Sequence, residues 1–565
     1  MKTQNIKLIP ICFLLLALAM GCETTNLDLL NNPSELTPES ADPDLLLNNA
    51  QLRFVAAIAY NEDNEDGLNV RAAETVRMQH LFGNYSGPFA ASNGSLDDAW
   101  KDLYRETLQD INVLLPIAEE RDLQGHIGIA KVIKAFAFVT LVDIWGDVPY
   151  SEALQGSAVI APNVEDGQVI YNDMLVVLDE AIAALNNASI MPADDLFYAG
   201  DASKWITAAR TLKFKMYAQM RLIGNFQSEI NTLISQGIID DASEDLEFKY
   251  STVSSATGES RHPYYALCYD SDGADDFMNN YYMYLLKDDK GFNDPRLRYY
   301  FYRQTPTAPE GDFLDCEGDA VINFCYIGDF YWGRDHGYDA GVDPDQLLRT
   351  TYGLYPVGGA YDGDDFKPVT NNVGAGGAGI FPFMLSSYVK FLMAESALTI
   401  GTTGNPRTLL EEGIRASMDK VANFQSSAIT ASLSNILIPD DPDTEDVNEE
   451  VTVGDRPEEY LITTDNVNNY VDYVLDAYDA ATSDEERLDI IMKEYYIALW
   501  GNGIEAYNMY RRTSMPSDMS DPVIEAGSFM RSFLYPAAES ATNPNIPEKP
   551  VTTKVFWDTN PDNLK

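Results

Sequence analysis

Aromatic side chains gather with glycine and short polar residues in three stretches that carry no helical pattern, residues 82–93, 264–282 and 325–338. Sugar rings expose C–H faces ringed by hydroxyl groups. Exposed aromatic rings beside short polar side chains are therefore the chemistry that a neutral saccharide needs. The alternative for each ring is packing within its own loop, or contact with a partner protein. The candidate ligand contacts are Tyr85, Phe89, Asn93, Tyr265, Tyr326, Tyr331, Trp332 and Arg334.

The N-terminus carries a different chemistry, the attachment of lipid to a thiol. Lys2 and Lys7 form a basic start, and the apolar residues 8–20 lead through Gly21 into Cys22. An apolar run of about 13 residues is too short to span a bilayer and is typical of a signal peptide. Because the residues before Cys22 resemble a lipobox, we expect the mature chain to begin there, held at a membrane by acyl chains. The alternative is an ordinary signal peptide with a chance cysteine.

Residues that could bind a metal ion are scattered. The four histidines, His80, His126, His262 and His336, are far apart in sequence and form no metal motif. Residues 270–276 resemble a calcium loop only faintly, because the full spacing with a terminal glutamate is missing. We expect neither a metal site nor a cofactor.

Three cysteines remain once the signal segment and the lipidated Cys22 are set aside. An oxidising compartment would permit a Cys316–Cys325 disulfide closing a short loop, with Cys268 left free. The spacing alone does not decide between this bridge and two unpaired thiols. We carry the bridge forward as a hypothesis.

The charge balance limits the classes of ligand and partner. The chain has 38 Lys and Arg residues against 88 Asp and Glu residues, a formal net charge of -50. Nucleic acid and anionic lipid surfaces need a basic footprint, so neither is an expected partner. The same field disfavours polyanionic ligands such as uronate or sulfated glycans. A neutral ligand is favoured.

Helical periodicity dominates most of the chain that must position the candidate residues. Apolar side chains fall on one helical face in residues 129–139, 171–185, 205–216 and 488–499. Ser203 and Ser483 lie where N-caps belong.

One long segment, residues 247–382, lacks this pattern and is dense in glycine, aspartate and tyrosine. A stretch of this length without regular helix is normally functional. We expect a signal peptide at residues 1–21, a lipidated tether at 22–42, and a single domain at 43–565 with 247–382 as a loop-rich insertion.

Short sequence motifs follow one another from Cys22 towards the C-terminus. They are Leu141–Ala153, Gly200–Trp205 with Ala208–Tyr217, Phe292–Leu297, Tyr496–Arg512, and Arg531–Pro536 with Asn543–Asn545. Together with the lipobox, they resemble the SusD/RagB family of outer-membrane nutrient-binding lipoproteins. Gly333–Gly337 and Leu348–Pro356 resemble its SusD-like, starch-binding and outer-membrane-associating subgroup. Most signature residues are expected to be structural: Trp145, Trp205 and Trp500 in the core, and Asp147, Asp201 and Arg511 at helix ends and turns.

The resemblance implies a mostly α-helical fold in which about four tetratricopeptide-like helix pairs form a scaffold and loops bind the ligand. It implies a lipoprotein anchored in the outer membrane, exposed at the cell surface, that captures oligosaccharides or polysaccharide. It also implies a partner, a SusC-like TonB-dependent transporter on which the lipoprotein sits as a lid.

Two other functions stay open at this stage. The first keeps the fold but makes the ligand a peptide, as in RagB-type relatives. The second is an all-α glycoside hydrolase, which needs two carboxyl groups at a set separation. Acidic residues are too numerous for such a pair to be recognised in the sequence. The resemblance favours a binding protein over an enzyme.

Overall fold

The computed structural model describes residues 41–59, 67–85, 94, 96–255, 258–269, 273–314, 324–339, 345–371, 373–424, 461–523, 527–561 and 564–565. The predicted signal peptide, Cys22 and nearly all of the tether lie outside these residues, as do Phe89, Asn93 and Cys316. Residues 43–565 form one compact unit. None of the helices in the described part of the chain has the length and apolar character needed to cross a bilayer.

Helices make up most of the regular structure. Those before residue 240 are α2 (Pro43–Ala59), α3 (Leu68–Thr75), α4 (Asp97–Lys101), a π-helical turn (Asp102–Leu108), α5 (Gln109–Glu120), α6 (Gln124–Trp145), α7 (Gly167–Asn186), α8 (Ala202–Gln219) and α9 (Gln227–Gln236). Those of the C-terminal part are α13 (Ser386–Thr399), α14 (Pro406–Asn423), α16 (Thr464–Ala480), α17 (Asp484–Ala498), α18 (Gly503–Thr513) and α19 (Ala537–Thr542).

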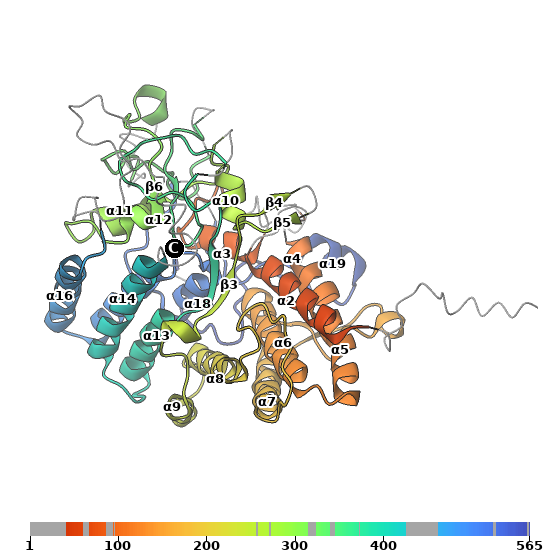
Figure 1. Ribbon diagram of the computed structural model, residues 1–565. Coiled ribbons are helices and arrows are strands. Elements are labelled where there is room, and N and C mark those ends of the chain that lie inside the picture. The colour runs from red at the N-terminus through yellow and green to blue at the C-terminus, as the bar shows by residue number, and fades with distance from the viewer. Residues whose placement is uncertain are drawn as a thin grey trace, which may run out of the picture. The chain divides into compact units, whose positions relative to one another are not determined.

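Neighbouring helices pack in pairs. Helix α6 packs against α5 and α7, α7 against α8, and α8 against α9, while α13, α14, α16 and α17 form a second set of contacting helices. Helix α18 packs on α3, so that the C-terminal part of the chain contacts the N-terminal part (Figure 1). This is the predicted mostly α-helical, tetratricopeptide-like scaffold.

Local sequence explains where these helices begin. The Asp166 carboxylate accepts hydrogen bonds from two backbone N–H groups at the start of α7, and Ser483 forms a capping box with Glu486 at the start of α17. The predicted cap at Ser483 is therefore confirmed. The cap of α8 is Asp201 and not Ser203, because the Asp201 carboxylate accepts from the N–H groups of Ser203 and Lys204.

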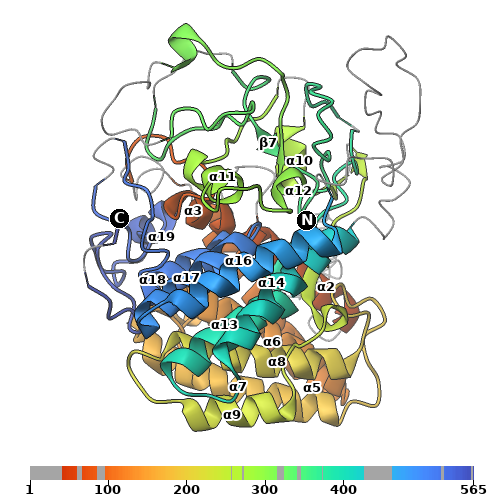
Figure 2. The same ribbon diagram turned by 90° about the vertical axis from the view of Figure 1, so that its left-hand side faces the viewer.

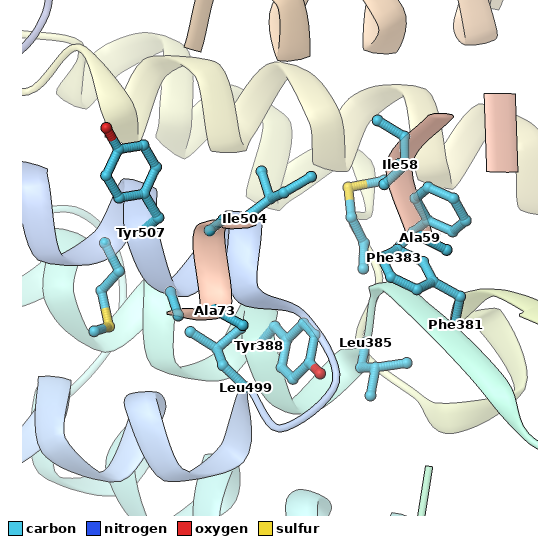
Figure 3. Packing of buried hydrophobic residues seen from close by; sticks show 14 of the residues in the cluster. Ile58, Ala59, Ala73, Phe381, Phe383, Leu385, Tyr388, Leu499, Ile504 and Tyr507 are labelled. Carbon is cyan, nitrogen blue, oxygen red and sulfur yellow. The ribbon is translucent and has the colours of Figure 1, made fainter. Parts of the chain in front are cut away.

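The core draws on both helical sets. The predicted core residues Trp145, Trp205 and Trp500 are each 1% exposed. Figure 3 shows core side chains from α2 (Ile58), α18 (Ile504) and strand β8, the last contributing Phe381 and Phe383. Helices α6 and α7 approach closely because α6 has a glycine at the contact. A Cβ atom on Gly128 would lie 2.4 Å from the Leu185 Cγ atom.

Two further signature residues hold turns, as predicted. Asp147 accepts a hydrogen bond from the Gly167 N–H at 3.0 Å and so orients the start of α7. The Arg511 guanidinium donates to the carbonyl oxygens of Arg531 and Asp143, which ties α18 to α6 and to the C-terminal segment.

The loop-rich segment 247–382 leaves and rejoins the scaffold at one place. Strand β3 (Leu246–Lys249) pairs antiparallel with β8 (Ile380–Met384), with Leu246 opposite Met384. In the described residues between them, the elements are all short: β4 (Ser254–Ser255), β5 (Gly258–Glu259), α10 (Pro263–Cys268), α11 (Asn280–Lys287), α12 (Leu297–Tyr300), β6 (Phe301–Tyr302), a 3-10 helix (Gly311–Leu314) and β7 (Thr351–Tyr352). Figures 1 and 2 show this segment gathered on one side of the helices.

Candidate functional site

The Gly333-Arg-Asp-His turn is held by backbone and side-chain contacts to the start of α11. The Gly333 N–H donates to Asn280 Oδ1 at 2.8 Å, and the Arg334 N–H donates to the Met278 carbonyl oxygen at 2.9 Å. A Cβ atom on Gly333 would lie 2.2 Å from that same oxygen, so the turn accommodates only glycine. The turn therefore has one conformation imposed by its neighbours.

A buried ion network fixes the side chains around this turn. Asp345 is fully buried and pairs with Arg334 at 2.9 Å and with the Arg349 Nε atom. Burial, and then the neighbouring Arg334 charge, lower the pKa of Arg349 to about 10, which leaves it charged at neutral pH. One carboxylate thus balances two crowded guanidinium groups.

The two aromatic residues at the centre of the third stretch each lie beside a guanidinium group that is paired with a carboxylate. Trp332 is 3% exposed, and the Arg349 guanidinium lies 3.9 Å from its ring centroid. Tyr331 is also 3% exposed, with Arg303 4.6 Å from its ring centroid. Both rings have a face covered by a cation. Their burial favours the loop-packing alternative, and ligand contact at these two residues stays a prediction.

The space beside Trp332 is too small for a sugar ring. The cavity lined by Asn280, Trp332, Gly333, Asp335 and neighbouring side chains has a volume of about 10 Å³. That volume matches roughly one water molecule. Burial raises the pKa of Asp335 to about 6.

The other candidate side chains of the third stretch also contact residues of the protein itself. Arg334 is 5% exposed and lies over the rings of Phe82 and Phe277. Tyr326 is half-buried, and its hydroxyl accepts a hydrogen bond from the Phe330 N–H at 2.9 Å. Of the candidates in this stretch, Tyr326 therefore keeps the most accessible ring.

The structure brings the first aromatic stretch to the third. The Tyr85 hydroxyl is 3.0 Å from His336 Nε2, and Phe82, which is 44% exposed, packs on His80 and Phe277. Tyr85 itself is buried. Phe89 and Asn93 lie outside the described residues.

Tyr265 belongs to a different stack of rings. It is fully buried, lies parallel to Tyr269 with ring centroids 4.6 Å apart, and donates its hydroxyl to the Val373 carbonyl oxygen. The structure places it beside Arg261, whose guanidinium lies 5.6 Å from its ring centroid. These contacts favour packing of Tyr265 within its own loop over contact with a ligand.

The two described cysteines have the predicted states, one in a disulfide bond and one free. Cys325 takes part in a disulfide bond, whereas Cys268 is free and buried. Cys316, the predicted partner of Cys325, lies outside the described residues. Within those residues no group of three or more His, Cys, Asp and Glu side chains could hold a metal ion. Asp270 and Asp272 of the faint calcium motif fall outside that search.

The structure has one groove that the sequence analysis did not predict. A groove with a volume of about 470 Å³ runs between residues 292–298 and the first half of α16. Its signal in the sequence was Asn466, Asn469 and Tyr473 at helical spacing, opposite Phe292. An alternation of amides and aromatic rings in an acidic helix is weak evidence before the fold is known.

Comparison with known proteins identifies the family of this chain. Residues 33–319, just over half of the chain, match the model of the SusD-like family described as "Starch-binding associating with outer membrane". The chain belongs to the SusD/RagB family. Residues 378–552 match a second SusD-like model, described as "Susd and RagB outer membrane lipoprotein".

Relatives of this SusD-like chain include proteins of known structure. A SusD-like protein P25 from Formosa agariphila is 30% identical over 189 residues, 31% of this chain and 33% of that protein. The chain thus matches about a third of this curated relative's length. A SusD/RagB family protein from Bacteroides thetaiotaomicron has the same fold, with 18% identity, a TM-score of 0.65, and coverage of 92% of this chain and 100% of the other. A chitin-binding SusD homologue from Flavobacterium johnsoniae aligns over the same shares at 18% identity and a TM-score of 0.61.

Proposed function

We propose that this SusD-like protein is a cell-surface lipoprotein that captures neutral oligosaccharides and delivers them to a SusC-like TonB-dependent transporter. Membership of the SusD/RagB family carries this proposal, because both matching models describe proteins of the outer membrane. The lipobox that ends at Cys22 supplies the anchor that such a location needs.

Several features support a neutral saccharide as the ligand. A chitin-binding SusD homologue shares the fold over nearly the whole chain, and the first family model is described as starch-binding. The net charge of -50 disfavours polyanionic glycans. In this proposal the protein binds and releases its ligand unchanged and is not an enzyme.

The buried rings around the Gly333 turn have a supporting role in this proposal. The ion network of Asp345 holds the loop in one shape, and a rigid loop loses little entropy when a ligand binds. Ligand contact by Tyr331, Trp332, Arg334, Tyr85 and the other candidates is a proposal that needs its own test. Of the candidates that the structure describes, Tyr326 is the one whose exposure suits such contact without rearrangement.

The test of the ligand class is calorimetry on the mature chain. Neutral oligosaccharides, charged glycans and peptides are titrated separately into the purified protein. Binding of a neutral oligosaccharide and of no other class is the expected result. Binding of peptides alone would identify a RagB-type peptide receptor instead. Release of new reducing ends during incubation with a bound glycan would identify a hydrolase.

The test of the location and the partner uses the native membrane. Outer membranes solubilised in mild detergent should yield a complex of this protein with a β-barrel of the TonB-dependent type. Cys22→Ala should be found in the soluble fraction or as an uncleaved precursor. A mature, membrane-bound Cys22→Ala protein, or a wild-type protein that never co-purifies with a barrel, contradicts the proposal.

A further inference from the structure

The groove beside α16 lies outside the candidate loops. One wall is formed by the segment Phe292–Arg298, which enters α12, and the other by Asn466 and Asn469 of α16. Figure 2 shows α16 along the boundary between the helices and the loop-rich segment that carries α11 and α12. Its volume of about 470 Å³ lies within the range of small-molecule sites.

Two aromatic rings are exposed beside this groove: Phe292 lines it, and Tyr473 of α16 contacts the Phe292 ring. Phe292 is 38% exposed and Tyr473 is 44% exposed, and their centroids are 5.3 Å apart at an interplanar angle of 86°. Phe292 also meets the buried Tyr470 edge-on, with centroids 6.1 Å apart. Because Tyr470 and Tyr473 lie three residues apart on one face of α16, they hold the Phe292 ring in a fixed orientation. The exposed pair is thus a rigid apolar platform whose two rings stand at right angles, so that a given sugar ring can stack on only one of them.

Uncharged amides flank the platform. Asn293 and Asn469 are exposed, and in the described part of the chain neither side chain has a hydrogen-bond partner. Asn466, Asn469 and Tyr473 follow one helical face at intervals of three and four residues. Each amide offers both a donor and an acceptor, which is what a sugar hydroxyl requires.

The charged groups of the groove wall are already paired. Asp294 is buried and pairs with Arg296 at 2.6 Å, and the Arg298 guanidinium pairs with Asp364 at 2.8 Å. The nearest exposed charges on α16 are carboxylates, including Asp472 next to Tyr473. Among the described residues that line it, the groove therefore offers no unpaired cation to an anionic ligand and fits a neutral one.

The segment 292–298, which forms one wall of the groove, is tied to three helices through the buried Arg296. The Arg296 guanidinium donates to the Ser417 hydroxyl of α14 at 2.9 Å and to the Tyr470 hydroxyl of α16 at 3.3 Å. Tyr470 in turn donates to Glu494 of α17 at 2.7 Å. A groove built on such a network is organised before a ligand arrives, which reduces the entropic cost of binding.

We propose that this groove is a binding site for a neutral oligosaccharide. One sugar ring stacks on one ring of the Phe292–Tyr473 pair and contacts the other ring with its edge, and Asn293 and Asn469 bind its hydroxyl groups. The proposal rests on the proposed function and places the saccharide where exposed rings exist, whereas Tyr331 and Trp332 are buried. Packing of a partner protein on the same rings is the competing explanation.

The experiment compares binding by the wild-type mature chain with binding by Phe292→Ala/Tyr473→Ala. Hexasaccharides of N-acetylglucosamine, of α-1,4-glucose and of β-1,4-glucose are each titrated by calorimetry. We expect the double variant to bind the preferred hexasaccharide about tenfold more weakly or worse, since contact with both rings is lost. Asn469→Ala, which leaves both aromatic rings in place, should also weaken binding and serves if the double variant does not fold. Ile160→Ala/Val176→Ala, which removes exposed apolar side chains elsewhere, should bind as the wild type does.

The outcomes separate this proposal from the proposed function. If the wild type binds no hexasaccharide, both fail. If the wild type binds one and the folded groove variants bind it equally well, only the groove proposal is overturned. If the groove variants keep their affinity for the saccharide but no longer co-purify with a barrel, the face is a protein-docking surface and the saccharide proposal is wrong.

Discussion

The Arg349 guanidinium lies 3.9 Å from the centroid of the Trp332 ring and is held there by Asp345, which also binds Arg334. Each of these side chains is less than a tenth exposed. A cation, an aromatic ring and a carboxylate therefore form one packed unit. The Trp332 ring thus contributes to the stability of the loop. This arrangement makes stability the first property that mutations here should change.

Trp332→Ala should lower the free energy of unfolding by about 3–5 kcal/mol, the usual cost of removing a large buried aromatic side chain. Tyr331→Phe is the matched control. The Tyr331 hydroxyl is buried without a hydrogen-bond partner among the described residues, so its removal should cost little. Urea denaturation measures both. A Trp332→Ala protein of wild-type stability that has lost saccharide binding would instead restore Trp332 as a ligand contact.

Asp345→Asn should destabilise the protein by several kcal/mol. The substitution leaves two buried guanidinium groups near each other without their shared carboxylate, and breaking a buried pair costs about 3–5 kcal/mol. The same substitution at Asp479, whose pair with Arg407 is about half exposed, should have a much smaller effect, because solvent screens an exposed pair. Denaturation curves for the two variants test the difference. Equal effects would show that burial of the Asp345 pair has little energetic consequence.

The helical scaffold could be predicted because its signals are local. Apolar spacing around Met216 and Ile491, and the capping residue Ser483, act within one or two turns of helix. Core positions such as Trp205 could be predicted because they lie on the apolar face of a helix. The expectation that Asp201 lies at a helix end is confirmed, whereas the N-cap predicted at Ser203 is wrong by two residues, since both side chains are good caps and only the backbone decides between them.

The candidate site was harder because loop composition does not report burial. Tyr331 and Trp332 lie among glycines and aspartates, as exposed sugar-binding rings would. Their burial depends on Arg303 and Arg349, whose approach is a tertiary contact without a sequence period. The groove beside α16 was missed for the complementary reason: Phe292 and Tyr473 are far apart in sequence and meet only in the fold.

Gly333→Ala should destabilise the loop although alanine is a small residue. Its Cβ atom would lie 2.2 Å from the Met278 carbonyl oxygen, so the turn must move away from α11. Overpacking of this kind costs about 1–3 kcal/mol. Gly258→Ala is the matched control, because a Cβ atom there meets nothing within 4 Å. Thermal unfolding should show a lower midpoint for Gly333→Ala alone, and equal midpoints would contradict the close approach.

Asp276 should make stability depend on pH. It is buried against Gln79 and Tyr352, and burial, followed by the nearby Glu74 charge, raises its pKa from 3.8 to about 7. Between these two values the folded chain binds the proton more tightly than the unfolded chain. The contribution of this group to the free energy of unfolding therefore falls as pH rises from about 4 to about 7, and levels off above that range. Asp276→Asn, which imitates the protonated form, should remove this fall, so the variant should gain stability relative to the wild type as pH rises from 5 to 8. Unfolding free energies of both proteins across this interval provide the measurement, and parallel curves would mean that Asp276 titrates at its ordinary pKa.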